Sequence, residues 1–269
     1  MAETAARKVA LVTGAARGLG RAMALGLAKA GHVVAACDLP SSAAELQTLA
    51  GEALPNGALL HPLHCDVTDT DQCRAAVADV RKNFGAVDIL VNDAAIGMEV
   101  VTPHIHDNPF KFYEIEESFW RRVLDINMLG TFRMTKLVAP QMVARGWGRV
   151  INITTSLTTM IKAGFSPYGP SKAAIESASA IWSKELAGTG VTVNVLIPGA
   201  PANTRMIPEE DVAARDQLVQ PDAMVPPLLW LVSRDADRVT GRRYQAKLWS
   251  PDLPAEKAEQ IAGANVAWG

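Results

Sequence analysis

Short runs of hydrophobic residues, many of them β-branched, alternate along the chain with longer stretches whose hydrophobic positions recur at helical spacing. Such runs are typical of strands buried on both faces of a parallel sheet. They predict strands at Lys8–Thr13, Val33–Cys37, Ala58–Cys65, Val87–Val91, Arg149–Thr154, Val191–Leu196 and Tyr244–Leu248. The stretches between them predict helices at Gly18–Ala30, Ser41–Gly51, Asp69–Phe84, Ser118–Arg145, Tyr168–Gly188 and Pro226–Ser233, with Pro140 expected to bend the fourth helix.

The regular alternation of strand and helix predicts parallel strands joined by right-handed crossovers. Residues 1–269 contain no linker, low-complexity tract or internal repeat. We therefore expect one doubly wound, Rossmann-like α/β domain, with helices on both faces of a mostly parallel seven-stranded sheet.

Composition narrows the classes of function. The chain has 269 residues, of which 49% are hydrophobic, and Lys plus Arg number 26 against 28 for Asp plus Glu, a net charge of −2. This balance offers no strong field for nucleic acid or an anionic membrane. No hydrophobic stretch approaches the roughly 20 residues of a membrane span, and the first residues lack the hydrophobic core of a signal peptide. Three cysteines without a CxxC motif argue against disulfides and structural zinc, so we expect reduced thiols in a cytoplasmic protein.

A glycine-rich turn follows the first predicted strand. In the sequence Thr13–Gly20, TGAARGLG, Gly14, Gly18 and Gly20 flank Arg17 and Leu19. Glycines at such a turn let the backbone approach a phosphate closely, and the next helix offers free N–H groups and a positive dipole end. The position of this loop after a buried strand predicts a site for a dinucleotide pyrophosphate.

Asp38 ends the second predicted strand, eighteen residues after Gly20. A dinucleotide fold places there the acid that accepts hydrogen bonds from the adenosine ribose. A carboxylate repels the 2′-phosphate of NADP, and Leu39 supplies no positive charge, whereas Arg17 favours a phosphate. We expect NAD as the cofactor, with NADP as the less favoured alternative.

Tyr168 and Lys172 lie four residues apart at the start of a predicted helix, so their side chains share one face. A phenol has an ordinary pKa near 10 and is a poor base at neutral pH. A neighbouring ammonium and a positive nicotinamide would favour the phenolate. The pair therefore predicts acid–base chemistry.

Taken together in order and spacing, these motifs are specific, and the chain resembles the short-chain dehydrogenase/reductase family along almost its full length. The matching features are TGAARGLG at 13–20, Asp38, Asp66 with Val67, Asn92-Asp93-Ala94-Ala95, Asn127, Ser156, Tyr168 with Lys172, and Pro198-Gly199.

The resemblance implies roles for individual residues. Tyr168 would be the general acid/base on the substrate oxygen, Ser156 would orient that oxygen, Lys172 would hold the nicotinamide ribose and lower the pKa of Tyr168, and Asn127 would hold a water in a proton relay. Cofactor contacts are implied for Gly14, Arg17, Gly18, Leu19, Gly20, Asp38, Asp66, Val67, Asn92, Ala94, Tyr168, Lys172, Pro198 and Gly199.

The chain also departs from the family pattern. Asp93 is an extra acid, and Ala95 replaces a glycine. Ser156 lies twelve residues before Tyr168, whereas thirteen is commoner, and that position is Thr155, whose hydroxyl could do the same work. The segment Gly241–Trp249 replaces a strand that usually ends in Gly-Gly, and the tail beyond it is longer than usual.

The resemblance places the substrate between the loops after the fourth, fifth and sixth strands. These loops contribute hydrophobic residues, namely Met98, Phe110, Phe112, Tyr113, Leu157, Met160, Ile161, Phe165, Met206 and Ile207. About half of them are expected to serve local packing, and the rest predict a mainly apolar substrate, with a cyclic or aromatic molecule as one candidate. His104 and His106 have no third ligand nearby, so no metal is expected.

The leading hypothesis is an NAD-dependent oxidoreductase that transfers a hydride between nicotinamide and a small secondary alcohol or ketone. The alternatives are an NADP-dependent ketone reductase and a non-catalytic dinucleotide-binding regulator, because the fold alone cannot decide. The joint presence of Asn127, Ser156, Tyr168 and Lys172 favours an enzyme.

A homodimer or homotetramer is expected, because helices Ser118–Arg145 and Tyr168–Gly188 match those that pair subunits in this family. These helices also carry surplus hydrophobic residues such as Phe132, Met134, Ile181 and Trp182.

Overall fold

The computed structural model describes residues 7–53, 59–100, 110–208 and 214–268. Eight strands form one sheet in the order β3-β2-β1-β4-β5-β6-β7-β8, and β8 is the one that runs antiparallel to its neighbour. The strands are β1 (Val9–Thr13), β2 (Val33–Asp38), β3 (Leu59–His64), β4 (Ile89–Asn92), β5 (Gly148–Ile153), β6 (Val191–Ile197), β7 (Arg242–Gln245) and β8 (Gly263–Asn265). The chain thus forms the single α/β domain that the alternation predicted.

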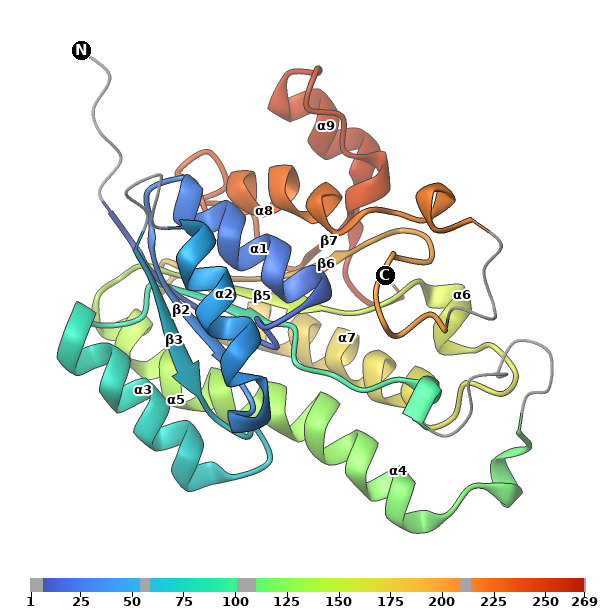
Figure 1. Ribbon diagram of the computed structural model, residues 1–269. Coiled ribbons are helices and arrows are strands. Elements are labelled where there is room, and N and C mark those ends of the chain that lie inside the picture. Colours follow the sequence, from blue (N-terminus) through green and yellow to red (C-terminus); the bar gives the residue numbers. More distant parts are fainter. Residues whose placement is uncertain (1–6, 54–58, 101–109, 209–213, 269) are drawn as a thin grey trace.

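Helices cover both faces of the sheet (Figure 1). Those on one face include α1 (Gly18–Lys29), α2 (Ala43–Ala53) and α8 (Val225–Leu231), and those on the other include α3 (Thr70–Phe84), α5 (Thr131–Ala144) and α7 (Tyr168–Glu185). The remaining α-helices of the described chain are α4 (Glu117–Val123), α6 (Leu157–Met160) and α9 (Ala255–Ala262).

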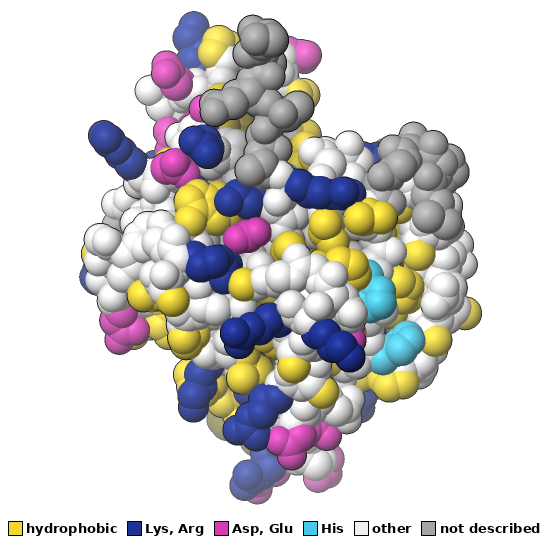
Figure 2. All heavy atoms as spheres, turned by 90° about the vertical axis from the view of Figure 1, so that its left-hand side faces the viewer, with side chains coloured by type: hydrophobic (Ala, Val, Ile, Leu, Met, Phe, Trp, Pro, Cys, Tyr) yellow, Lys and Arg dark blue, Asp and Glu magenta, His cyan; other side chains and the backbone are white. Residues whose placement is uncertain are grey.

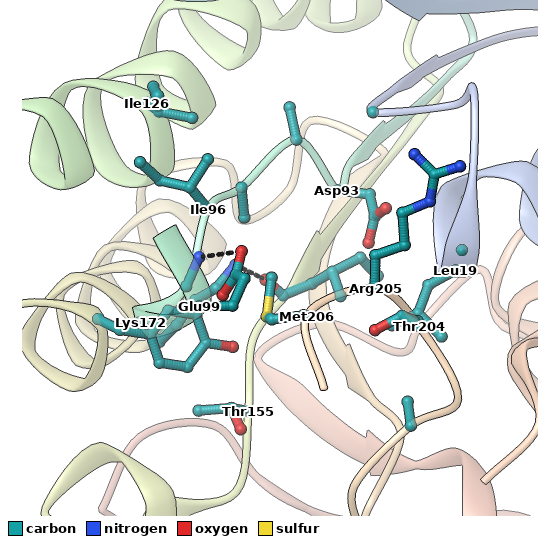
Figure 3. Close-up of a pocket in the computed structure, with 18 of the residues that line it drawn as sticks. Leu19, Asp93, Ile96, Glu99, Ile126, Thr155, Lys172, Thr204, Arg205 and Met206 are labelled. Carbon is teal, nitrogen blue, oxygen red and sulfur yellow. Dashed lines mark hydrogen bonds between the residues drawn. The ribbon is translucent and has the colours of Figure 1, made fainter. Parts of the chain in front are cut away.

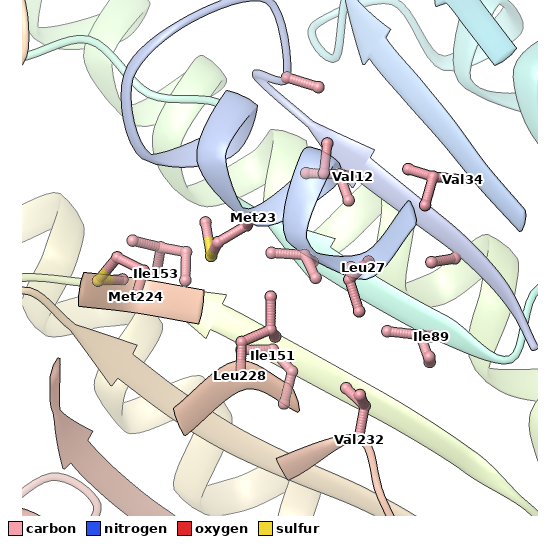
Figure 4. Packing of buried hydrophobic residues seen from close by; sticks show 14 of the residues in the cluster. Val12, Met23, Leu27, Val34, Ile89, Ile151, Ile153, Met224, Leu228 and Val232 are labelled. Atoms are coloured by element: carbon pink, nitrogen blue, oxygen red, sulfur yellow. The ribbon is translucent and has the colours of Figure 1, made fainter. Parts of the chain in front are cut away.

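Each strand divides its side chains between two hydrophobic cores because successive side chains point to opposite faces. Along β1, Ala10 and Val12 pack under α1, whereas Val9 and Leu11 pack on the α3 side. Figure 4 shows Met23 and Leu27 of α1 directed into the first core together with Ile151 of β5. These packed layers fix the carboxyl ends of the strands, where the site lies.

Two strand predictions needed correction. The sheet has eight strands rather than seven, because Gly263–Asn265 adds a short antiparallel strand that carries no hydrophobic alternation. The seventh strand covers Arg242–Gln245 rather than Tyr244–Leu248, and Ala246–Leu248 forms a 3₁₀ turn. Arg242 and Arg243 did not predict the start of a strand, because charged residues are rarely buried without partners.

The long helix predicted at Ser118–Arg145 is divided by a π-helical segment, Leu124–Gly130, between α4 and α5. Pro140 lies inside α5, which continues to Ala144. A π-helical turn inserts an extra residue into the helix and is frequent at functional sites. Asn127 lies in this segment, so the irregularity falls on a predicted site residue.

Charged side chains are spread over the face shown in Figure 2. Lys and Arg side chains lie there among hydrophobic and uncharged ones, with a few acidic groups between them. Within the described part of the chain, no helix has the length and hydrophobicity that a membrane crossing needs. Cys37, Cys65 and Cys73 are buried free thiols.

Candidate active site

A cleft of about 860 Å³ runs along the carboxyl ends of the central strands. The sheet order reverses between β1 and β4, and open α/β sheets bind their ligands at such a point. Residues after each of the strands β1 to β6 line the cleft. Figure 3 shows part of this lining, with Asp93, Lys172 and Met206 among the labelled side chains. Most of the predicted cofactor and chemical residues share this cavity, whereas Gly20, Asn92 and Asn127 do not line it.

The glycine-rich loop forms a backbone cradle at the start of α1. Gly14 has a φ of 68°, and a Cβ on it would lie 2.9 Å from the backbone N of Ala94. A Cβ on Gly20 would lie 2.3 Å from the carbonyl oxygen of Gly14. Side chains at these two positions would therefore collide with backbone. The N-cap residue Arg17 makes no side-chain cap hydrogen bond, which leaves N–H groups of the first turn of α1 open to a phosphate, apart from that of Gly20, which faces Asp93.

Asp38 and Arg17 both line the cleft. The Asp38 carboxylate accepts hydrogen bonds from the backbone N–H of Ala16 at 2.9 Å and of Leu39 at 2.8 Å. Arg17 donates to the Ser42 hydroxyl at 2.9 Å and pairs with Glu45 at 3.4 Å. An acid and a base thus stand together where an adenosine ribose is expected, and Asp66 and Val67 line the cavity beside them.

The two predicted cofactor residues at the end of β4, Asn92 and Ala94, have different surroundings. Ala94 lines the cleft, whereas the buried Asn92 side chain donates to Asn152 of β5 at 2.9 Å and to Thr135 of α5 at 3.1 Å. Asn92 therefore ties the central strands to α5. Leu19, Pro198 and Gly199 line the cavity.

Asp93 lies inside the cleft on the side of α1, near Leu19 (Figure 3). The Gly20 N–H donates to its carboxylate. Burial raises the pKa of Asp93 above its ordinary value, while the charge of Lys172 and the Gly20 hydrogen bond oppose that rise and the charge of Asp38 adds to it. One of the free N–H groups at the helix start therefore already has an acidic neighbour.

Tyr168 is buried at the first residue of α7 and lines the cleft together with Thr155. Burial raises the pKa of Tyr168, the Thr155 hydrogen bond lowers it, and the charges of Glu99 and Asp93 raise it further. The resemblance implied a pKa lowered by Lys172. The pKa moves in the opposite direction because the phenol is desolvated in a hydrophobic pocket.

Ser156 has a different place from the one the resemblance implied. It is the N-cap of α6, where its hydroxyl accepts a hydrogen bond from the backbone N–H of Thr159 at 3.1 Å and contacts the hydroxyl of Thr159 at 2.6 Å. The hydroxyl that meets Tyr168 is the one thirteen residues upstream, on Thr155. The usual family spacing, thirteen residues before the tyrosine, was the sequence signal that pointed to Thr155.

Lys172 lies one turn beyond Tyr168, and its ammonium donates to the carbonyl oxygen of Ile153 at 2.9 Å. Burial lowers the pKa of Lys172, and the charge of Asp93 opposes that shift. Asn127, fully buried, donates to the carbonyl of Ile96 at 3.0 Å and to the Ser171 hydroxyl at 3.0 Å, and it accepts from the Ile96 N–H at 2.9 Å. The π-helical segment thus fastens the strand end after β4 to the helix that carries Tyr168.

The other end of the cleft is mainly hydrophobic. Met98 packs with the Tyr168 ring, and Phe165 and Met206 close around them. Phe112 and Tyr113 are each 71% exposed and Ile161 is 84% exposed, so these three predicted lining residues face solvent. His104 and His106 lie outside the described residues, and no group of three potential metal ligands occurs among the residues described.

Sequence reasoning missed several lining residues, namely Glu99, Thr159, Thr204 and Arg205. Glu99 lies beside Met206 in Figure 3 and accepts the Gly97 N–H at 3.2 Å, and burial raises its pKa. Thr204 would contact a Cβ on Gly18, so the loop after β6 folds over the glycine turn. These residues come from loops whose path the pattern of hydrophobic positions does not determine.

Known proteins share this arrangement. The family model described as short chain dehydrogenase matches residues 8–213. The chain belongs to the short-chain dehydrogenase family. This family consists of oxidoreductases that bind NAD(P) and act on small molecules.

Curated relatives in this family carry different names. Nodulation protein G of Azospirillum brasilense is 35% identical over 244 residues, which cover 87% of this chain and 94% of that protein. The 3-oxoacyl-[acyl-carrier-protein] reductase FabG of Thermotoga maritima is 31% identical over 243 residues, with the same shares covered. Fluoren-9-ol dehydrogenase of Terrabacter sp. is 29% identical over 265 residues, covering 92% of this chain and 72% of that protein.

Solved structures in the short-chain dehydrogenase family superpose on this chain. A gluconate 5-dehydrogenase from Burkholderia cenocepacia, in complex with NADP and tartrate, gives a TM-score of 0.75 at 28% identity, covering 88% of this chain and 91% of that one. The likeness extends over the whole αβ framework that forms the cleft.

Proposed function

We propose that this short-chain dehydrogenase transfers a hydride between a nicotinamide dinucleotide and a secondary alcohol or ketone. The observation that carries the proposal is that Tyr168 and Thr155 line the hydrophobic end of a cleft whose other end is a glycine cradle. The N-cap of α1, where Arg17 makes no side-chain cap hydrogen bond, and the absence of room for side chains at Gly14 and Gly20 fit a dinucleotide pyrophosphate there.

Tyr168 would act on the proton of the substrate oxygen. When bound, the nicotinamide accepts or supplies the hydride. In alcohol oxidation Tyr168 takes the hydroxyl proton, and in ketone reduction it gives that proton back. The Thr155 hydroxyl would hold the same oxygen in place, and Lys172, fixed by the Ile153 carbonyl, would hold a positive charge and hydrogen-bond donors near the cofactor ribose. Asn127 would keep α7 in register with the strand end after β4.

NAD is the proposed dinucleotide. The Asp38 carboxylate, held by two backbone N–H groups, stands where a ribose would bind and would repel a 2′-phosphate. The alternative is an NADP-dependent ketone reductase, which Arg17 beside Ser42 favours, as does the NADP bound by the Burkholderia relative.

The proposed substrate is a mainly apolar molecule that carries the alcohol or ketone, with a cyclic or aromatic ring system as the leading candidate. The hydrophobic side chains of Met98, Phe165 and Met206 around Tyr168 support it. The name of the Terrabacter relative, fluoren-9-ol dehydrogenase, points to the same class.

The test is a screen of cyclic, aromatic and hydroxy-acid alcohols with NAD and with NADP, followed by absorbance of the reduced nicotinamide. We expect turnover of apolar cyclic alcohols with NAD, and a shift of preference toward NADP in the variant Asp38→Ala/Leu39→Arg. More efficient use of NADP by the wild-type protein would contradict the cofactor assignment. Dinucleotide binding without turnover of any alcohol or ketone would instead support a non-catalytic regulator.

A further inference from the structure

A buried ion pair lies directly behind the Tyr168 site. Glu176 is fully buried and Arg243 is 5% exposed, and the Arg243 Nε lies 3.0 Å from the Glu176 Oε1. Glu176 is on α7, four residues beyond Lys172 and eight beyond Tyr168, so the three side chains share one face of the helix. Arg243 is on β7, where the family resemblance gave no reason for a charge.

The pair holds both residues that follow β5. The Thr154 hydroxyl donates to the Glu176 Oε1 at 2.6 Å, and the Arg243 Nη2 donates to the carbonyl oxygen of Thr155 at 2.5 Å. The side chain of that same Thr155 lines the cavity together with Tyr168. The ion pair therefore holds the backbone of a residue that stands in the active-site cavity with Tyr168.

The C-terminal end of the chain completes this cluster. The backbone N–H of Ala267 donates to the Glu176 Oε2 at 3.0 Å, across 91 residues of sequence. Ala267 has a φ of 61°, a conformation that alanine keeps only when its surroundings hold it.

A purely structural role does not explain the pair well. A buried ion pair loses the hydration of both charges, and hydrophobic replacements of similar volume are often neutral or stabilising. Hydrophobic neighbours for such replacements are present, because Val195, Ile197 and Val266 pack together next to the pair's own strand and tail. What the charged pair adds is the hydrogen bonds to Thr154, Thr155 and Ala267.

We infer that Glu176 and Arg243, locked by the N–H of Ala267, are positioning residues that hold Thr155 against the Tyr168 hydroxyl. The inference rests on the proposed function, in which Tyr168 moves the substrate proton. Without the pair, the Thr155 backbone can shift, the Thr155–Tyr168 hydrogen bond weakens, and the Tyr168 phenolate becomes less favourable.

The test removes both charges together in Glu176→Leu/Arg243→Met, so that no unpaired charge is left buried. We expect kcat for alcohol oxidation to fall roughly tenfold, since displacement of a catalytic group by less than 1 Å costs this much or more. The KM for the dinucleotide should stay near the wild-type value, and the rise of oxidation rate with pH should move to higher pH. In a Thr155→Val background the paired variant should cost nothing further, because both changes act through one hydrogen bond.

The chain offers a matched control on the same strand. Arg242 and Glu259 also form a pair, at 3.4 Å, but they join β7 to α9. Glu259→Gln should leave kcat and the pH profile unchanged. If the paired variant fails to fold, Arg243→Lys replaces it, because lysine keeps the charge balance but lacks the fork that reaches both Glu176 and Thr155.

A measurement that does not depend on enzyme activity distinguishes failure of this inference from failure of the proposed function. The chain has three tyrosines, so ring-labelled tyrosine gives three NMR resonances, and Tyr168→Phe identifies the one of Tyr168. That resonance should move in the paired variant or in Arg243→Lys, and stay in Glu259→Gln, whether or not any alcohol is oxidised. An unmoved Tyr168 resonance, or a loss of kcat that adds fully to that of Thr155→Val, would overturn the inference.

Discussion

At the scale of the residue, the question is which hydroxyl beside Tyr168, that of Thr155 or that of Ser156, orients the substrate oxygen. The sequence left Thr155 and Ser156 as alternatives, and the structure gives them different neighbours: Tyr168 for the first and the start of α6 for the second. We expect Thr155→Val to lower kcat roughly 10- to 100-fold, because it removes a donor at the reacting oxygen. Ser156→Ala should lower stability by about 1 kcal/mol through loss of an N-cap, with a smaller effect on kcat. Turnover and thermal unfolding of both variants check this, and a reversed order would restore Ser156 to the reacting oxygen.

Asp93 is the residue that should make cofactor binding sensitive to pH. Its pKa is raised by burial, so it is neutral more often at low pH and ionises as the pH rises, beside Gly20, Lys172 and Asp38. An ionised Asp93 repels dinucleotide phosphates at the start of α1, so wild-type affinity should fall as pH rises. Asp93→Asn removes this charge while keeping the shape, and affinity at high pH should increase roughly tenfold. Calorimetric titration with NAD at several pH values checks this, and an unchanged pH dependence in the variant would contradict it.

At the scale of the element, the turn before α1 depends on glycine where backbone meets backbone. A Cβ on Gly20 would collide with the Gly14 carbonyl, whereas Gly51, on the exposed side of α2, has open space around it. Gly20→Ala should therefore lower both the melting temperature and NAD affinity. Gly51→Ala should raise stability by about 0.5–1 kcal/mol through the helix propensity of alanine. Calorimetric melting and NAD titration of the pair of variants distinguish a constrained turn from a general effect of the substitution.

The sequence predicted most elements because buried parallel strands carry a strong local signal. It could not predict the π-helical segment at Leu124–Gly130, since one extra residue in a helix leaves the hydrophobic spacing nearly intact. It also could not place Arg243, whose charge is buried only because Glu176 lies opposite it, 67 residues away in sequence. In the site, local motifs identified Tyr168 and Lys172, whereas the choice of Thr155 depended on how the chain turns after β5.

At the scale of the whole molecule, two helices leave hydrophobic residues exposed. Phe132 of α5 is 39% exposed and Ile181 of α7 is 51% exposed, although Met134, also expected at an interface, is fully buried in the core. We predict a dimer or tetramer with two-fold contacts through α5 and α7. Sedimentation equilibrium at micromolar concentration should give a multiple of the 28.7 kDa chain mass, and Phe132→Glu/Ile181→Glu should reduce it. A wild-type mass equal to one chain would contradict this.

Turnover of Tyr168→Phe tests most directly whether Tyr168 moves the substrate proton. This variant keeps the ring that packs against Met98 and removes the hydroxyl that meets Thr155. With the alcohol that the wild-type protein oxidises best, kcat should fall by at least the 10²–10⁴-fold that is typical of losing a general acid/base. Dinucleotide affinity, measured in the same preparation, should stay near the wild-type value, because the glycine cradle and Asp38 are untouched. A Tyr168→Phe protein that turns over at the wild-type rate would contradict the account.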